Sequence, residues 1–178
     1  MPDICDMILD EHGIFRRRFA ELDEKRGEGA GADVLGRLWN PLAALLDRHA
    51  SAEEDLFYPG LLRWGAHGEE ETDDAVRDHN KIRDAVRDAN KSDVGSASWW
   101  AAVDRAREEN SDHMAEEERG PLADFRAHTD AAARHALGDR FVAFSAEHAG
   151  GRAISGDDTD LDDYIDAHTD RQPTDGTA

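Results

Sequence analysis

The sequence contains few of the residues on which several common kinds of site depend. Only one of its 178 residues is a cysteine, Cys5, so an internal disulfide and a thiolate-based metal site are both excluded. Lysine and arginine together number 21 against 41 aspartates and glutamates, which gives a formal net charge of −20 at pH 7. Nucleic acid and anionic membrane surfaces bind basic proteins, so neither is expected as a partner of this acidic protein.

Long apolar runs and glycine-rich phosphate loops are also absent. No run approaches the roughly 18 apolar residues of a membrane-spanning helix, and residues 1–6 lack the basic and apolar parts of an export signal. We therefore expect a cytoplasmic protein without a membrane segment. The glycines between Gly27 and Gly31 are not followed by the lysine and Ser/Thr of a phosphate loop.

Apolar residues recur at three- and four-residue steps along most of the first 150 residues, which predicts an all-α protein. The expected helices cover about residues 3–25, 33–64, 70–90, 96–118 and 129–148. We expect the first four to form an antiparallel up-down four-helix bundle. The last would be an additional C-terminal helix.

The domain organisation follows from where this periodic pattern stops. Residues 1–150 are expected to form one domain, with the four-helix core covering about residues 3–125. Residues 151–178 are acidic and poor in apolar side chains, which predicts a largely flexible tail. The exceptions in the tail are three residues that we expect to dock as a short segment: Leu161, Tyr164 and Ile165.

Four histidines occupy core-facing positions of the four expected bundle helices. Two of them begin a His-x-x-x-Glu motif, and residues four apart lie on one face of a helix, so each motif directs an imidazole and a carboxylate toward the same point. The order His, His-x-x-x-Glu occurs twice, which indicates two helix pairs related by a pseudo-twofold axis. The six residues are His12, His49, Glu53, His79, His113 and Glu117.

A metal centre would explain why these polar residues face the core. Burying an ionised carboxylate without a partner costs several kcal/mol or forces its protonation. A pair of cations removes this cost, because each carboxylate can bridge both ions while each ion takes two imidazoles. The alternative is that the histidines form ion pairs with the glutamates. Imidazole and carboxylate suit iron, manganese and zinc alike, so ligand type alone leaves the metal open.

Other acidic residues lie beside these candidates in the sequence. Glu54 and Glu118 follow the two candidate glutamates but do not share their position on the helix face, so we expect them to be solvated or to lie outside the ligand set. Glu11 and Asp78 precede candidate histidines and point elsewhere on the helix. They are expected to be poor partners for those adjacent rings.

Tyr58 is a candidate for a catalytic role at the same centre. It follows Glu53 by five residues and immediately precedes Pro59, which lacks an N–H and is expected, like Pro41, to bend or interrupt its helix. A distorted helix would turn the phenol inward, to ligate a metal or to donate a hydrogen bond to bound peroxide. The alternative is a tyrosine that packs at the end of the bundle with its hydroxyl in water.

This pattern of four histidines and two glutamates resembles the hemerythrin-like (HHE cation-binding) proteins, which are non-haem diiron four-helix bundles. The residues that carry the resemblance are His12, His49-Ala-Ser-Ala-Glu53, His79 and His113-Met-Ala-Glu-Glu117. The resemblance covers about residues 3–125. It implies two iron ions with an oxo or hydroxo bridge, with zinc or manganese as alternatives. It also implies that Glu53 and Glu117 bridge the ions, with two histidines on each side.

The sequence differs at one position from the oxygen-carrying proteins that it resembles. Those carriers have a fifth histidine one turn after the histidine ligand of the third helix. Arg83 occupies that position here. Four histidines leave each iron about one ligand short, so reversible oxygen carriage is not expected. The resemblance implies binding of dioxygen, peroxide or nitric oxide, with catalase-like peroxide disproportionation as the leading hypothesis. The alternatives are an oxygen, nitric oxide or iron sensor, an iron-storage protein without catalysis, and a zinc-loaded structural bundle.

Overall fold

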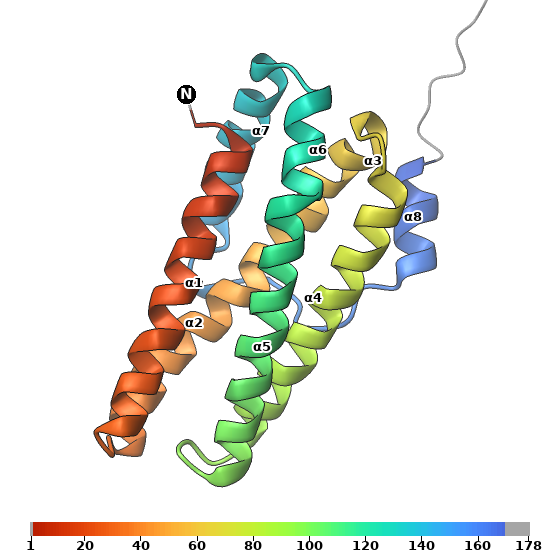
Figure 1. Cartoon of the computed structure of the whole chain (residues 1–178). Helices are drawn as coiled ribbons and strands as arrows, with labels where there is room; N and C mark the ends of the chain where they lie inside the picture. The colour runs from red at the N-terminus through yellow and green to blue at the C-terminus, as the bar shows by residue number, and fades with distance from the viewer. Residues whose placement is uncertain (1, 170–178) are drawn as a thin grey trace, which may run out of the picture.

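The computed structural model describes residues 2–169, and helices joined by short loops account for most of them (Figure 1). Four long helices lie side by side, and each points in the direction opposite to the long helix before it in the sequence. They are α1 (Ile4–Gly27), α2 (Ala32–Ala52), α4 (Gly68–Lys91) and α5 (Ala97–Arg119). The predicted all-helical class is confirmed, since no strand occurs within residues 2–169.

The helix predicted over residues 33–64 is three consecutive helical segments. After α2 come a π-helix, η1 (Glu53–Phe57), and α3 (Tyr58–Trp64). Pro59 has no N–H with which to continue the regular pattern, and the backbone N–H of Tyr58 donates instead to the carbonyl of Glu53, five residues earlier. Pro41 does not end its helix, because α2 continues through it.

The apolar core consists of two clusters separated along the bundle. One contains Phe15, Trp39 and Trp99, and the other contains Ile8 and Phe57, all of them buried. On α1 the two clusters are contributed by residues on either side of His12, and on α4 by residues on either side of His79. A polar layer therefore crosses the middle of the bundle with apolar packing above and below it.

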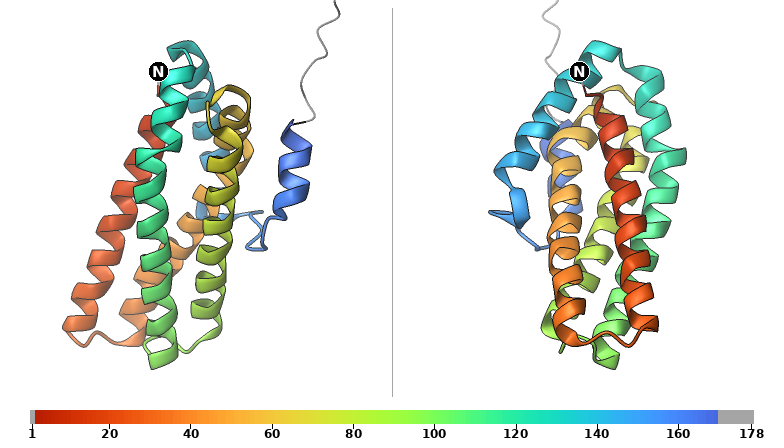
Figure 2. Two further views of the ribbon diagram at one scale, coloured as in Figure 1. Left: turned by 45° about the vertical axis from the view of Figure 1, so that its right-hand side comes forward. Right: turned by 90° about the vertical axis from the view of Figure 1, so that its left-hand side faces the viewer.

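The additional C-terminal helix predicted over residues 129–148 corresponds to α7 (Ala131–Glu147), which packs along α1 and α2 (Figure 2). A short helix that was not predicted separately, α6 (Pro121–His128), precedes it. Close packing of α7 on the start of α1 requires a glycine at position 138. A Cβ there would lie 2.2 Å from the backbone oxygen of Pro2.

Beyond α7 the chain forms a single 3-10 turn, η2 (Ala149–Gly151), and then α8 (Leu161–Thr169), which lies against α3 and α4. Tyr164 is buried, and Leu161 and Ile165 pack against the core cluster, so their predicted docking is confirmed. The rest of the predicted tail, residues 170–178, lies outside the described residues. Among the described helices, none is long and apolar enough to cross a membrane.

Candidate metal centre

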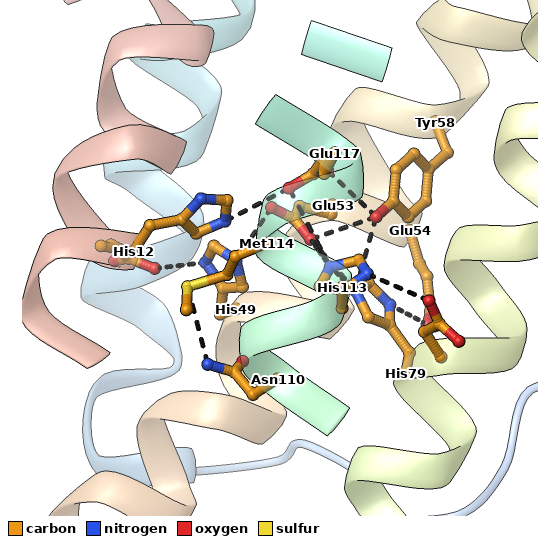
Figure 3. Close-up of polar contacts among 12 residues, drawn as sticks. His12, His49, Glu53, Glu54, Tyr58, His79, Asn110, His113, Met114 and Glu117 are labelled. Carbon is orange, nitrogen blue, oxygen red and sulfur yellow. Dashed lines mark hydrogen bonds and ion pairs between the residues drawn. The ribbon is translucent and has the colours of Figure 1, made fainter. Parts of the chain in front are cut away.

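The six predicted residues converge in the polar layer between the two apolar clusters (Figure 3). Each is at most 3% exposed. Their potential ligand atoms form two groups, and within each group all atoms lie within 4.8 Å of one another. The first group is His12, His49, Glu53 and Glu117, and the second is Glu53, His79 and His113. Glu53 belongs to both groups, so its carboxylate lies between the two possible ion positions.

The side chains of the first group face one another without forming hydrogen bonds. His12 Nε2 lies 3.2 Å from Glu117 Oε2, and His49 Nε2 lies 2.9 Å from Glu53 Oε1. None of these four buried atoms has a hydrogen-bond partner. Buried polar atoms are nearly always satisfied in folded proteins, so these atoms indicate a missing partner at this point.

Each histidine ring also has a carboxylate at its outer nitrogen, Nδ1. The pairs are His12 with Glu118 at 3.0 Å, His49 with Glu11 at 2.9 Å, His79 with Glu54 at 2.8 Å, and His113 with Asp78 at 4.0 Å. At His12, His49 and His79, where the distance is that of a hydrogen bond, the outer carboxylate keeps a ring proton on Nδ1 and directs Nε2 inward. Inward lone pairs beside carboxylate oxygens repel one another unless a proton or a metal ion lies between them. The donor set therefore fits a metal.

The four outer carboxylates extend the predicted pseudo-twofold relation beyond the six central residues. Glu11 and Asp78 each precede a central histidine, and Glu54 and Glu118 each follow a central glutamate. As expected, Glu11 and Asp78 do not pair with the adjacent rings. Each instead faces the histidine of the next long helix, a contact that spacing within one helix does not predict. Their matching positions in the two halves are the signal that could have revealed this.

Tyr58 lies among the central residues and not at a solvent-exposed end of the bundle. Its side chain is fully buried, and its hydroxyl is 3.1 Å from Glu117 Oε1, 3.3 Å from Glu53 Oε2 and 3.4 Å from His79 Nε2. The alternative in which this hydroxyl lies in water is wrong. The π-helix is the local cause, because the wider turn brings residues five apart, Glu53 and Tyr58, onto one face.

The electrostatics of the metal-free cluster favour bound protons. Burial opposes the charge of His49, but Glu53 and Glu11 outweigh it and raise the pKa of His49 to about 10. Burial, together with the negative charges of Glu117 and Glu53, raises the pKa of Tyr58 well above its usual value, so the phenol is neutral and can donate a hydrogen bond. A metal ion entering this cluster would replace protons, as is general for imidazole and carboxylate ligands.

Arg83, at the position of the carriers' fifth histidine, does not replace that ligand. Its side chain is buried and turns outward to Glu54, with Nη1 2.9 Å from Oε1 and Nη2 3.0 Å from Oε2. Burial alone would raise the pKa of Glu54, but His79 and Arg83 lower it to about 2. Glu54 is therefore an anion held between a central histidine and an arginine.

A cavity of about 190 Å³ adjoins the centre between α4 and α5. His113 and Glu117 form part of its wall, together with the acidic residues Glu71, Asp78 and Glu116. Of the six central residues, His113 and Glu117 are therefore the two that this cavity adjoins.

Glu71, which lines this cavity, is expected to make the stability of the protein depend on pH. Burial and the neighbouring Asp124 raise the pKa of Glu71 to about 7. The folded state then binds the proton more tightly than the unfolded state, whose pKa is near 4.5, so this group lowers stability as the pH rises between these values. Glu71→Gln removes the penalty. We expect its unfolding temperature to exceed that of the parent at pH 8, with a smaller difference at pH 5; a difference that does not grow with pH would contradict this assignment.

Comparison with known proteins places the chain in a family. A model of the family described as "Hemerythrin HHE cation binding domain" matches residues 3–123, which is more than half of the chain and includes all six central residues. Searches of curated proteins and of solved structures find no significant match. From the extent of the family match and the buried histidine and glutamate cluster, the chain belongs to the hemerythrin HHE cation-binding domain family.

Proposed function

We propose that this protein holds two iron ions in the polar layer of an antiparallel four-helix bundle and disproportionates peroxide. The observation that carries the proposal is the pair of ligand groups, which share Glu53 and direct unpartnered nitrogen and oxygen atoms toward one another. An iron pair supplies two-electron redox chemistry, so that one peroxide is reduced to water while a second is oxidised to dioxygen without an external donor.

The chain's own residues would hold and surround this pair. His12, His49 and Glu117 would hold one ion and His79 and His113 the other, and Glu53 would serve both. Because Arg83 pairs with Glu54, it would supply no ligand to the ions, and a small molecule such as peroxide, dioxygen or nitric oxide would complete their coordination. The apolar clusters on both sides of the layer exclude water, and the neutral phenol of Tyr58 offers a proton inside it.

The test begins with the optical spectrum of the natively purified protein, recorded before and after adding peroxide, together with metal analysis and oxygen evolution. We expect near-ultraviolet bands typical of an iron pair to survive while peroxide disappears and oxygen evolves. A protein that contains two irons and evolves no more oxygen than the same amount of free iron would exclude the reaction. Zinc or manganese in the natively purified protein would exclude iron as the resident metal.

Tyr58→Phe separates a functional phenol from a packing residue. Removing the hydroxyl takes away the group that lies 3.1 Å from Glu117 and 3.3 Å from Glu53. We expect the variant to lose any visible phenolate-to-iron band and to turn over peroxide about 100-fold more slowly, in the range typical of a lost proton donor. Ser92→Ala is the control, because it removes a hydroxyl whose hydrogen bond goes to the Asp88 backbone oxygen, away from the centre. If Tyr58→Phe has the spectrum and rate of the parent, Tyr58 has no catalytic role.

A second candidate function, a sensor of iron, oxygen or nitric oxide, is favoured by one observation. The C-terminal part of the chain forms hydrogen bonds to Glu54, the outer partner of His79, so a change at the centre can reach a separate element. A sensor predicts that protease cuts this part of the chain at different rates in metal-free and metal-loaded protein. Equal rates would argue against sensing.

A further inference from the structure

The two halves of the centre are alike in their residues but differ in how well their outer carboxylates are enclosed. Each half has an arginine four residues after the histidine of its first helix, Arg16 in one and Arg83 in the other, and each arginine pairs with the outer carboxylate. Arg16 and Glu118 are 49% and 29% exposed, whereas Arg83 and Glu54 are only 3% and 8% exposed. The two halves therefore have corresponding residues, but solvent reaches the outer carboxylate of one half far more than that of the other.

Residues 152–169, here called the C-terminal segment, cause this difference. The Thr159 hydroxyl donates a hydrogen bond of 2.7 Å to Glu54 Oε2, and the Tyr164 hydroxyl donates one of 2.5 Å to the Glu54 backbone oxygen. Within residues 2–169, the only side chains that form hydrogen bonds to the Glu118 carboxylate are those of His12 and Arg16. The segment thus supports one outer carboxylate and leaves its counterpart open.

The position of the C-terminal segment is itself closely defined. The Asn80 side chain binds the backbone of Thr159 at both polar groups, accepting from its N–H at 2.9 Å and donating to its carbonyl at 2.9 Å. Asn80 directly follows His79 on α4, so the segment is attached beside the ring whose orientation it affects. Arg87, two turns farther along α4, pairs with Asp158 at 2.7 Å.

We propose that the C-terminal segment is a positioning element of the metal centre that acts on one ion position only. By holding Glu54 through Thr159 and Tyr164, it fixes the His79 ring and so sets the affinity of the position formed by His79 and His113. The position formed by His12 and His49 does not depend on it. This inference rests on the proposed two-ion centre. Outer partners of metal-binding histidines orient the ring and raise its basicity, and their loss typically lowers affinity by about 10- to 100-fold.

Thr159→Val tests the inference, because it keeps the shape of the side chain and removes the hydroxyl. Metal-free full-length protein is titrated with Co²⁺, and two binding steps are followed by visible absorption and calorimetry. We expect one of the two affinities to fall by about 10-fold, the lower end of the range for a lost outer partner because Arg83 still holds Glu54, and the other to stay unchanged. Thr159→Ser should restore both affinities. Ser155→Ala is the matched control and should change neither affinity, because within residues 2–169 the Ser155 hydroxyl forms hydrogen bonds only with Asp157 of the same segment.

A double variant, Thr159→Val with Tyr164→Phe, removes both hydrogen bonds from the C-terminal segment to Glu54. It covers the case in which either hydrogen bond alone is enough to hold Glu54 in place. Two Co²⁺ affinities that both stay at the parent values in the double variant, or that both fall together, would overturn the inference while leaving the two-ion centre intact. Parent protein that binds no Co²⁺ would instead overturn the proposed centre, and the inference with it. Arg16→Gln should have the opposite selectivity, because Arg16 pairs with Glu118, the outer partner of His12. We expect it to lower the affinity that Thr159→Val leaves unchanged, and to leave the other affinity at the parent value.

Discussion

Glu53→Ala is expected to abolish binding of both metal ions, whereas His12→Ala should abolish binding of only one. Among residues 2–169, Glu53 is the only residue whose carboxylate belongs to both ligand groups, and it is completely buried. Its loss removes a charge from both positions at once, so the affinity of each should fall by more than the roughly 100-fold that the loss of an outer partner costs. The measurement is the ratio of metal to protein after dialysis, supported by calorimetric titration.

Asp55→Ala is the matched control for this prediction. Asp55 lies two residues from Glu53 in the same π-helix, but its side chain is exposed and belongs to neither ligand group. This variant should retain two ions with parent affinities. One ion retained by Glu53→Ala at near-parent affinity would show that Glu53 serves one position only, and the two ligand groups would then be independent sites.

Loading with metal is expected to raise the unfolding temperature substantially. An ion that binds only the folded state, at a free concentration of about 1,000 times its dissociation constant, adds about 4 kcal/mol to the free energy of unfolding. For a chain of this size each kcal/mol corresponds to about 2–4 °C, so each ion should add about 8–16 °C. The measurement is calorimetry of metal-free and metal-loaded protein under the same buffer conditions.

The dependence on pH distinguishes binding at this centre from binding to the acidic surface. Ions must displace protons from buried groups such as His49, whose pKa is about 10 in the metal-free protein. The temperature increase should therefore shrink as the pH falls, and it should be absent in Glu53→Ala at any pH. An equal increase in Glu53→Ala would show that the ions stabilise the protein from its acidic surface instead.

Spacing within single helices made the six central residues predictable from the sequence. Residues four apart share a face in any α-helix, so His49 with Glu53 and His113 with Glu117 had to point the same way once these segments were helical. The apolar stripes on either side of His12 and His79 likewise determined that both rings face the core. The low cysteine count and the charge of −20 already excluded thiolate sites and basic surfaces.

Tyr58 was determined only in part by the sequence. Pro59 predicts a distorted helix, because proline cannot donate the backbone hydrogen bond that a regular turn needs. A kink, a break and a π-helix all satisfy that requirement, and only the π-helix of the folded chain places the phenol 3.1 Å from Glu117 on another helix. Packing of η1 against its neighbours, which is a long-range property, decided among these outcomes.

The outer carboxylates and the C-terminal segment were decided by tertiary structure. Glu11 and His49 are separated by 38 residues, and Glu54 and Thr159 by 105. No periodic pattern connects residues so far apart, since helical spacing specifies neighbours only within a few turns. By itself the sequence determined which residues face the bundle interior. Only the packing of separate helices, and of the C-terminal segment on α4, decided which outer group holds each ring and why one half of the centre is enclosed while the other is open.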